Sequence, residues 1–145
     1  MSISSHMTDP LYYAAMEETA GQERRPLGLA LRRGLMLRCP ACGEGRLFRK
    51  FLKVTDRCHN CSEALFHHRA DDAPPYFTIL IVGHVVVPIM LAIELAYMPP
   101  LWVHMTVWPT VTLLLSLALL PRIKGAVIGW QWAARMHGFG GEPDI

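Results

Sequence analysis

The chain has 145 residues, of which 52% are hydrophobic and 18% are charged, with a formal net charge of +2. This small net charge argues against a strongly basic nucleic-acid-binding domain, and the mean hydropathy of +0.24 is high for a water-soluble protein. The apolar excess lies in residues 76–98 and 101–120, two runs of 23 and 20 residues that are each long enough to cross a bilayer as a helix. We therefore expect an α-helical membrane protein built on a two-helix transmembrane hairpin.

The first part of the chain contains no recognisable core pattern. Residues 1–25 are polar, so we expect a disordered N-terminal segment. Residues 26–37 place three leucines at four-residue spacing around a pair of arginines. We interpret this second segment either as a short amphipathic helix on the inner leaflet or as a simple lead-in to the following module.

The strongest motif is a pair of CxxC sequences. Cys39, Cys42, Cys58 and Cys61 are the only cysteines, and fifteen residues separate the two pairs, which is the spacing of a zinc ribbon. Four thiolates complete a tetrahedral shell and leave no open position, which favours a structural zinc ion over a catalytic one. A single iron ion and two disulfides are the alternatives. We expect residues 38–70 to form a small β-rich zinc ribbon whose folding depends largely on the metal.

An acidic pair, Asp71 and Asp72, precedes the first apolar run and is followed by two prolines. Aspartate caps exposed amides, and negative charge is favoured at the start of a helix, so we interpret the pair as a helix cap. The functional alternative is an acidic patch at the membrane surface that meets a partner or the basic ribbon.

Two ionisable side chains flank the Pro99–Pro100 link between the apolar runs. Glu94 lies about five residues before the link and His104 about five after it, so in an antiparallel hairpin both lie ~7–8 Å below the turn. We expect a hydrogen-bonded or ionic pair that fixes the register of the two helices. The alternative adds the sulfur atoms of Met98 and Met105 to form a transient copper(I) site.

The basic residues predict the topology. Of fourteen Lys and Arg residues, eleven precede residue 76, three follow residue 120, and none lies in the link at 99–100. The positive-inside rule then places both termini in the cytoplasm, where thiols stay reduced and bind metal in preference to forming disulfides. Residues 121–137 contain tryptophans and basic residues and predict a juxtamembrane helix or an extension of the second span, and residues 138–145 predict a loose tail.

Several short motifs together carry a family resemblance. They are the run from Cys39 to Phe48, the second cysteine pair, Arg69-Ala70-Asp71-Asp72, Gly83-His84, Glu94 and Lys124-Gly125. On these residues, over about 27–135, the chain resembles the small bacterial membrane proteins of domain of unknown function 983. It departs from their pattern at Ser62, where they have glycine, and at Ala73-Pro74-Pro75, where they have Gly-Pro-Ala.

The resemblance implies a bacterial inner-membrane protein, and members of such families often lie beside genes for cytochrome oxidase assembly. Within the shared motifs, Asp71, Asp72, His84 and Lys124 are the candidate interface residues. This genetic association is a weaker argument than a site would be, because a fold or a family does not by itself define a function.

Three functions remain in competition. No nucleophile with its base and no phosphate loop is recognisable, so we expect a non-enzymatic accessory or assembly factor for a respiratory, cytochrome oxidase-type complex. The ribbon would dock on the partner, and the hairpin would contact it within the lipid bilayer. The alternatives are a metal-handling or redox membrane protein and a membrane-tethered nucleic-acid-binding regulator, of which nucleic acid is the less favoured partner.

Overall fold

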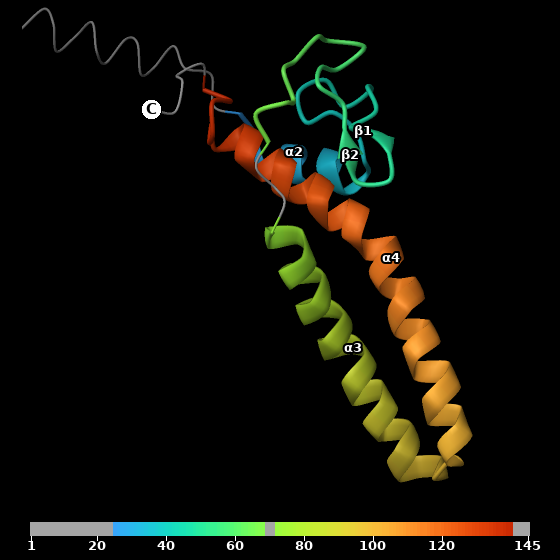
Figure 1. Ribbon diagram of the computed structural model, residues 1–145. Coiled ribbons are helices and arrows are strands. Elements are labelled where there is room, and N and C mark those ends of the chain that lie inside the picture. Colours follow the sequence, from blue (N-terminus) through green and yellow to red (C-terminus); the bar gives the residue numbers. More distant parts are fainter. Residues whose placement is uncertain (1–24, 69–71, 141–145) are drawn as a thin grey trace, which may run out of the picture.

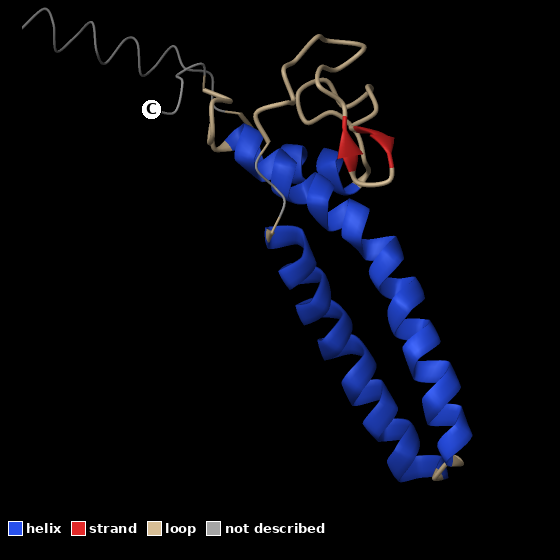
Figure 2. Ribbon diagram, in the orientation of Figure 1, coloured by secondary structure: helices blue, strands red, loops and turns tan. Residues whose placement is uncertain are grey.

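The structure, a computed structural model, describes residues 25–68 and 72–140 (Figure 1). In chain order its elements are helix α2 (Leu27–Leu35), strands β1 (Phe48–Lys50) and β2 (Lys53–Val54), and helices α3 (Ala73–Tyr97) and α4 (Leu101–Ala133). Figure 2 shows that α3 and α4 lie side by side as a long hairpin, while α2 and the cysteine-containing segment gather against the second half of α4. The expected disordered segment 1–25 falls outside the described residues except for Arg25.

Helix α3 is a candidate membrane-spanning helix of 25 residues. It begins three residues before the predicted run at 76–98 and ends one residue earlier, because Pro74 and Pro75 fit the first helical turn. At its other end Met98 adopts a left-handed conformation with φ of 44°, and the two following prolines cannot continue the helix. The chain therefore reverses sharply at the position that the Pro99–Pro100 link predicts.

Helix α4 is the second candidate membrane-spanning helix and is longer than predicted. We expected a span at 101–120 and allowed either a separate helix at 121–137 or an extension of the span; the structure shows one helix of 33 residues that continues through Pro121 and ends at Ala133. At 1.5 Å per residue it is about 50 Å long, more than the ~30 Å hydrocarbon core. Its last turns therefore extend beyond the start of α3 (Figure 1).

Helix α2 packs across this extension of α4 through small residues. Ala30 and Gly34 are buried, whereas Leu27 and Leu35 of the predicted leucine stripe are 46% and 45% exposed. A Cβ atom added to Gly34 would run into the backbone of Gly125. Residues 26–37 thus contain a helix, as one of the two interpretations predicted, and its face of small residues packs against α4.

The cysteine-containing segment does not fold on a core of its own. One apolar cluster combines residues of this segment, called the ribbon below, with residues of α2, α4 and the chain after α4. Its members are Ala30, Cys39, Leu47, Val54, Cys58, Leu65, Ile123, Val127, Ile128, Trp132 and Phe139. Phe139 is only 5% exposed, so residues 138–140 differ from the expected loose tail. Residues 141–145 and 69–71 lie outside the described chain.

Candidate functional site

The four cysteines meet at one point. Their sulfur atoms all lie within 4.8 Å of one another, and all four thiols are free. The Cys39–Cys61 and Cys42–Cys58 sulfur pairs are each 3.8 Å apart, far beyond a disulfide bond. Zinc–sulfur bonds of about 2.3 Å at tetrahedral angles require sulfur atoms about 3.8 Å apart, so the geometry fits a four-thiolate metal site. Within the described residues this is the one cluster of potential metal ligands.

Both CxxC turns close in the same way. The amide of Gly43 donates to the Cys39 carbonyl at 2.8 Å, and the amide of Ser62 donates to the Cys58 carbonyl at 3.0 Å. The residue after each pair is left-handed, with φ of 78° at Gly43 and 60° at Ser62. Glycine adopts this conformation without cost, whereas serine does not, so the Ser62 departure from the family pattern falls on a conformationally demanding position.

Helix α2 supports the first knuckle through an arginine. The Arg33 guanidinium donates to the carbonyl oxygens of Pro40 and Ala41 at 2.9 and 2.6 Å. The two knuckles are also joined, because the Asn60 amide donates to the Glu44 carboxylate at 3.0 Å. The position of the cysteine cluster is therefore tied directly to α2.

The thiols differ in their electrostatic environments. Burial raises the pKa of Cys39 and, less strongly, that of Cys61. Burial also opposes ionisation of Cys42, but hydrogen bonds from the backbone amides of Gly45 and Glu44 outweigh it and lower the pKa of Cys42 to about 6. The lowered pKa favours the thiolate of Cys42, which is the form that binds metal.

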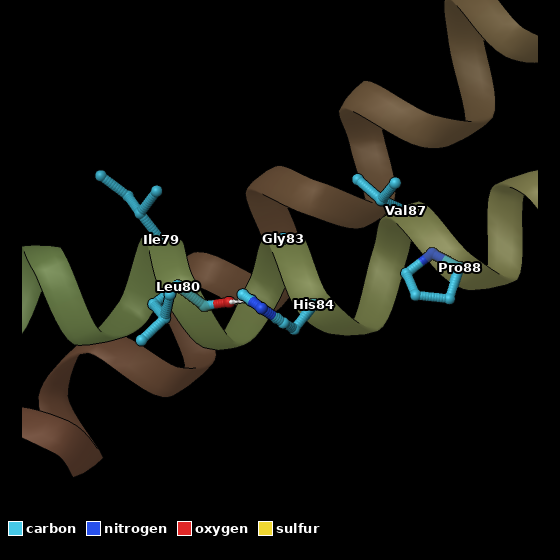
Figure 3. Close-up of a pocket in the computed structure, with 6 residues that line it drawn as sticks. All are labelled: Ile79, Leu80, Gly83, His84, Val87 and Pro88. Atoms are coloured by element: carbon cyan, nitrogen blue, oxygen red, sulfur yellow. Dashed lines mark hydrogen bonds between the residues drawn. The ribbon is translucent and has the colours of Figure 1, made fainter.

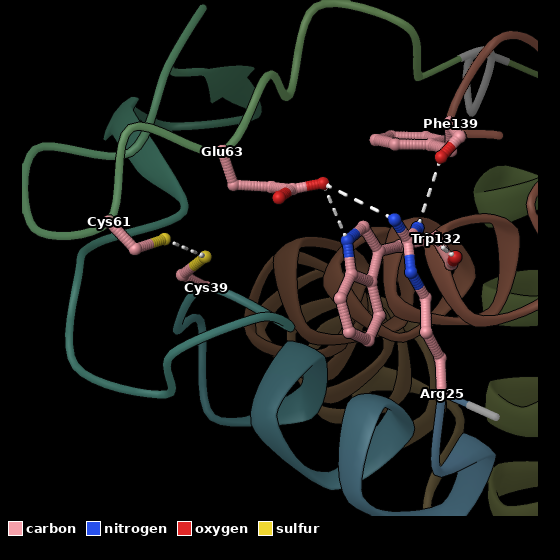
Figure 4. A network of polar contacts seen from close by, with 6 residues as sticks. All are labelled: Arg25, Cys39, Cys61, Glu63, Trp132 and Phe139. Atoms are coloured by element: carbon pink, nitrogen blue, oxygen red, sulfur yellow. Dashed lines mark hydrogen bonds and ion pairs between the residues drawn. The ribbon is translucent and has the colours of Figure 1, made fainter. Parts of the chain in front are cut away.

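A second set of contacts fastens the ribbon to the end of α4 (Figure 4). Glu63 lies just after the second cysteine pair in the chain. Its carboxylate accepts a hydrogen bond of 2.8 Å from the Trp132 indole N–H. Arg25 lies over the Trp132 ring at 4.4 Å from its centre and donates to the carbonyl oxygens of Trp132 and Phe139. The guanidinium also lies 3.9 Å from Glu63. These contacts join three segments that are far apart in the sequence.

Two of the candidate interface residues, Asp72 and Lys124, lie near the end of the hairpin opposite the Pro99–Pro100 link. Asp71 is outside the described residues. Asp72 is exposed and immediately precedes α3, but its side chain makes no capping hydrogen bond, so the capping interpretation is not observed for it. Lys124 is half-buried on α4 and is engaged in an interaction.

The fourth candidate, His84, lies in the middle of α3 on the face opposite α4. Its Nδ1 is 2.8 Å from the Leu80 carbonyl oxygen, as Figure 3 shows. A carbonyl can only accept, so Nδ1 carries the hydrogen and Nε2 of the neutral ring is an acceptor. The ring lines a surface hollow of about 440 Å³, together with Ile79, Leu80, Gly83, Val87 and Pro88.

Glu94 and His104 are brought together across the hairpin. His104 Nε2 lies 2.9 Å from the Glu94 carboxylate, and the Trp108 indole N–H donates to His104 Nδ1 at 3.1 Å. Because the indole can only donate, Nδ1 is the acceptor and Nε2 carries the hydrogen toward Glu94. Both ring nitrogens therefore have protein partners. This arrangement favours the register pair over the copper(I) site, which needs a free nitrogen.

Sequence reasoning missed the supporting residues Arg33, Glu63, Trp132 and Trp108. A partial signal exists for the tryptophans, because a buried indole N–H almost always needs an acceptor. No comparable signal identifies which acceptor it finds, since Glu63 and Trp132 are 69 residues apart.

Comparison with known proteins identifies a family but no characterised relative. No curated protein and no solved structure matches the chain. The family model described as "Protein of unknown function (DUF983)" matches residues 48–132, which include Cys58, Cys61, His84 and Glu94 but begin after the first cysteine pair. Because this match covers more than half of the 145 residues, the chain belongs to the DUF983 family.

Proposed function

We propose that this protein is a non-enzymatic accessory factor of the bacterial inner membrane, which binds one structural zinc ion and docks on a membrane-protein partner. Subunits of a respiratory, cytochrome oxidase-type complex are the first candidates for that partner, as the family resemblance implies. In this proposal α3 and α4 span the bilayer, and both chain termini and the ribbon lie in the cytoplasm.

The zinc ion would be held by Cys39, Cys42, Cys58 and Cys61. The tetrahedral sulfur spacing supports this assignment. A closed four-thiolate shell supplies folding free energy and no open coordination position, so the metal would act by holding the ribbon in shape. The ribbon is in turn fixed to α4 by the shared core and by Glu63 and Trp132. A partner would therefore meet a rigid cytoplasmic surface.

The observation that carries the proposal is the position of His84. Successive helical residues are rotated by about 100°, and Val82 and Val86 are the buried residues of this part of α3, so His84 points away from α4. It is the twelfth of 25 residues, close to the middle of the span. Its Nε2 has no hydrogen-bond partner within the described chain, and lipid tails cannot supply one.

A second copy of this chain is a poor partner for that nitrogen. In a symmetric parallel dimer that meets at this face, two Nε2 acceptors would oppose each other. Changing the tautomer would instead place a lone pair against the Leu80 carbonyl oxygen. A transmembrane helix of a different protein that presents a hydroxyl, amide or indole donor satisfies Nε2, and the adjacent Gly83 leaves room for its close approach.

The test is affinity purification of the full chain from its native membrane in mild detergent, followed by mass spectrometry of the bound proteins. The wild type should recover a stoichiometric integral membrane protein, and His84→Leu should lose it. Thr110→Val is the matched control, because the Thr110 hydroxyl already bonds to the Thr106 carbonyl of its own helix. Recovery of nucleic acid, or no membrane protein with the wild type, would refute the proposal.

A further inference from the structure

The turn between β1 and β2 has an unusual composition for its shape. Lys50 pairs with Lys53 across the two strands, so Phe51 and Leu52 form a two-residue hairpin loop. Such loops favour Asn-Gly or similar pairs, because they need positive φ angles. Here Leu52 adopts a φ of 60°, and the Phe51 side chain is 59% exposed. A bulky apolar pair thus occupies a position where small polar residues are normally found.

Cations surround this apolar tip. Arg49, Lys50 and Lys53 are all exposed, and the Lys50–Lys53 pair places like charges directly opposite each other. Arg49 lies 3.8 Å from the exposed carboxylate of Asp56. Within the described parts of the chain, neither lysine makes an ion pair. The tip therefore combines an exposed aromatic ring with positive charge that its own fold does not neutralise.

The tip also lies at the level where the helices begin their apolar spans. Leu47, which directly precedes β1, comes within 3.4 Å of the position that a Cβ atom on Gly125 would occupy. Gly125 lies 24 residues after the start of α4, and Ala73 lies 24 residues before the end of α3, so the two are level along the hairpin. Figure 1 shows the β1–β2 turn on the side of the ribbon that faces α4.

We propose that the tip, residues 49–53, inserts Phe51 and Leu52 into the headgroup region of the leaflet on the ribbon side of the membrane, where the unpaired Lys50 and Lys53 bind the phosphates of anionic lipids. Apolar side chains between cations are typical of segments that lie at the membrane interface. The orientation toward the helices favours lipid over nucleic acid, which would approach from the aqueous side. The inference rests on the membrane location in the proposed function.

The experiment uses the full, zinc-loaded chain in nanodiscs of phosphatidylcholine with or without phosphatidylglycerol. The photocrosslinker p-benzoylphenylalanine replaces Phe51, or Phe66 as a matched control, because Phe66 is 50% exposed on the ribbon but outside the tip. Position 51 should crosslink lipid, with a yield that rises with phosphatidylglycerol, and position 66 should not. Each of Lys50→Glu and Lys53→Glu should lower the phosphatidylglycerol-dependent yield about fivefold or more, since each juxtamembrane cation contributes about 1 kcal/mol.

A third crosslinker site, at Leu91 on the exposed face of α3, separates the two proposals. Lipid crosslinks at 91 but not at 51 would overturn the inference and leave the membrane location standing. An absence of lipid crosslinks at 91 would refute the membrane location itself. Equal yields at 51 and 66, or crosslinks from 51 to copurified nucleic acid or protein instead of lipid, would also overturn the lipid-binding tip.

Discussion

The contact between α2 and α4 can be tested with a single added methyl group. In the structure the backbones of Gly34 and Gly125 touch, so a Cβ atom on Gly125 would run into the Gly34 carbonyl oxygen and lie 2.9 Å from its carbon. Both obstacles are backbone atoms, which cannot rotate away as a side chain can. Gly125→Ala should therefore force α2 away from α4 and loosen the ribbon that α2 supports.

The size of the effect follows from two opposing terms. Overpacking a close contact costs about 1–3 kcal/mol, and the upper end applies here because the obstacle is backbone. Alanine gains about 1 kcal/mol over glycine within a helix. The net loss is about 2 kcal/mol, or roughly a thirtyfold decrease in the ratio of docked to undocked ribbon. Gly28→Ala is the control, because nothing lies within 4 Å of a Cβ atom at Gly28. It should leave docking unchanged or slightly improved.

Two measurements on the detergent-solubilised protein report the docked fraction. The first is the rate of zinc transfer to a chromogenic chelator, and the second is the rate of proteolysis within the ribbon, which follows the open population when reclosing is fast. Both rates should rise about thirtyfold in Gly125→Ala and stay at the wild-type level in Gly28→Ala. Equal rates in the two variants would show that α2 and α4 do not cross at the glycines.

Three further predictions concern the thiols, the topology and the hairpin. Replacing any one of the four cysteines by serine should leave membrane insertion intact but unfold the ribbon, because the metal supplies much of its folding free energy; elemental analysis of the wild type that shows no stoichiometric zinc would contradict it. Reporter fusions at Pro99 and at the C-terminus should lie on opposite sides of the membrane, and a shared side would exclude the hairpin topology. Glu94→Gln should lower the thermal stability of the hairpin, whereas Met105→Leu should have little effect; equal losses of bound copper(I) in both variants would instead revive the metal site.

The features that sequence predicted well have local signals. The cysteine cluster follows from two CxxC turns, each of which forms its hydrogen bonds within five residues. The depth of Glu94 and His104 follows from counting outward from the prolines, because helical rise is constant. The contact of His104 with Trp108 is equally local, within one turn of the same helix, although sequence reasoning missed it. In these cases short-range geometry alone brings the groups together.

The features that sequence did not predict depend on contacts between distant segments. The leucine spacing of α2 allowed an amphipathic helix but did not indicate which face packs against α4, where the backbones of Gly34 and Gly125 meet. The sequence left open whether residues after Leu120 form a separate helix or extend the second span; the structure shows the extension, whose residues share a core with α2 and the ribbon. Phe139 was expected in a loose tail, yet the His67 ring lies against it, with ring centres 5.8 Å apart.

These distant contacts make the candidate metal site and the two candidate membrane-spanning helices depend on each other. Leu47 and Leu65 of the ribbon are fully buried and belong to the same core cluster as Ile128 of α4, so the ribbon is not an autonomous module. The ribbon precedes α4 in the chain. Its cysteines can therefore bind metal before α4 contributes its residues to the shared core. Completion of that core requires α4 to be in place, because the hydrogen-bond partner of Glu63 is Trp132, near the end of α4. Metal binding can thus begin the folding of the ribbon, but assembly of the helix hairpin must finish it.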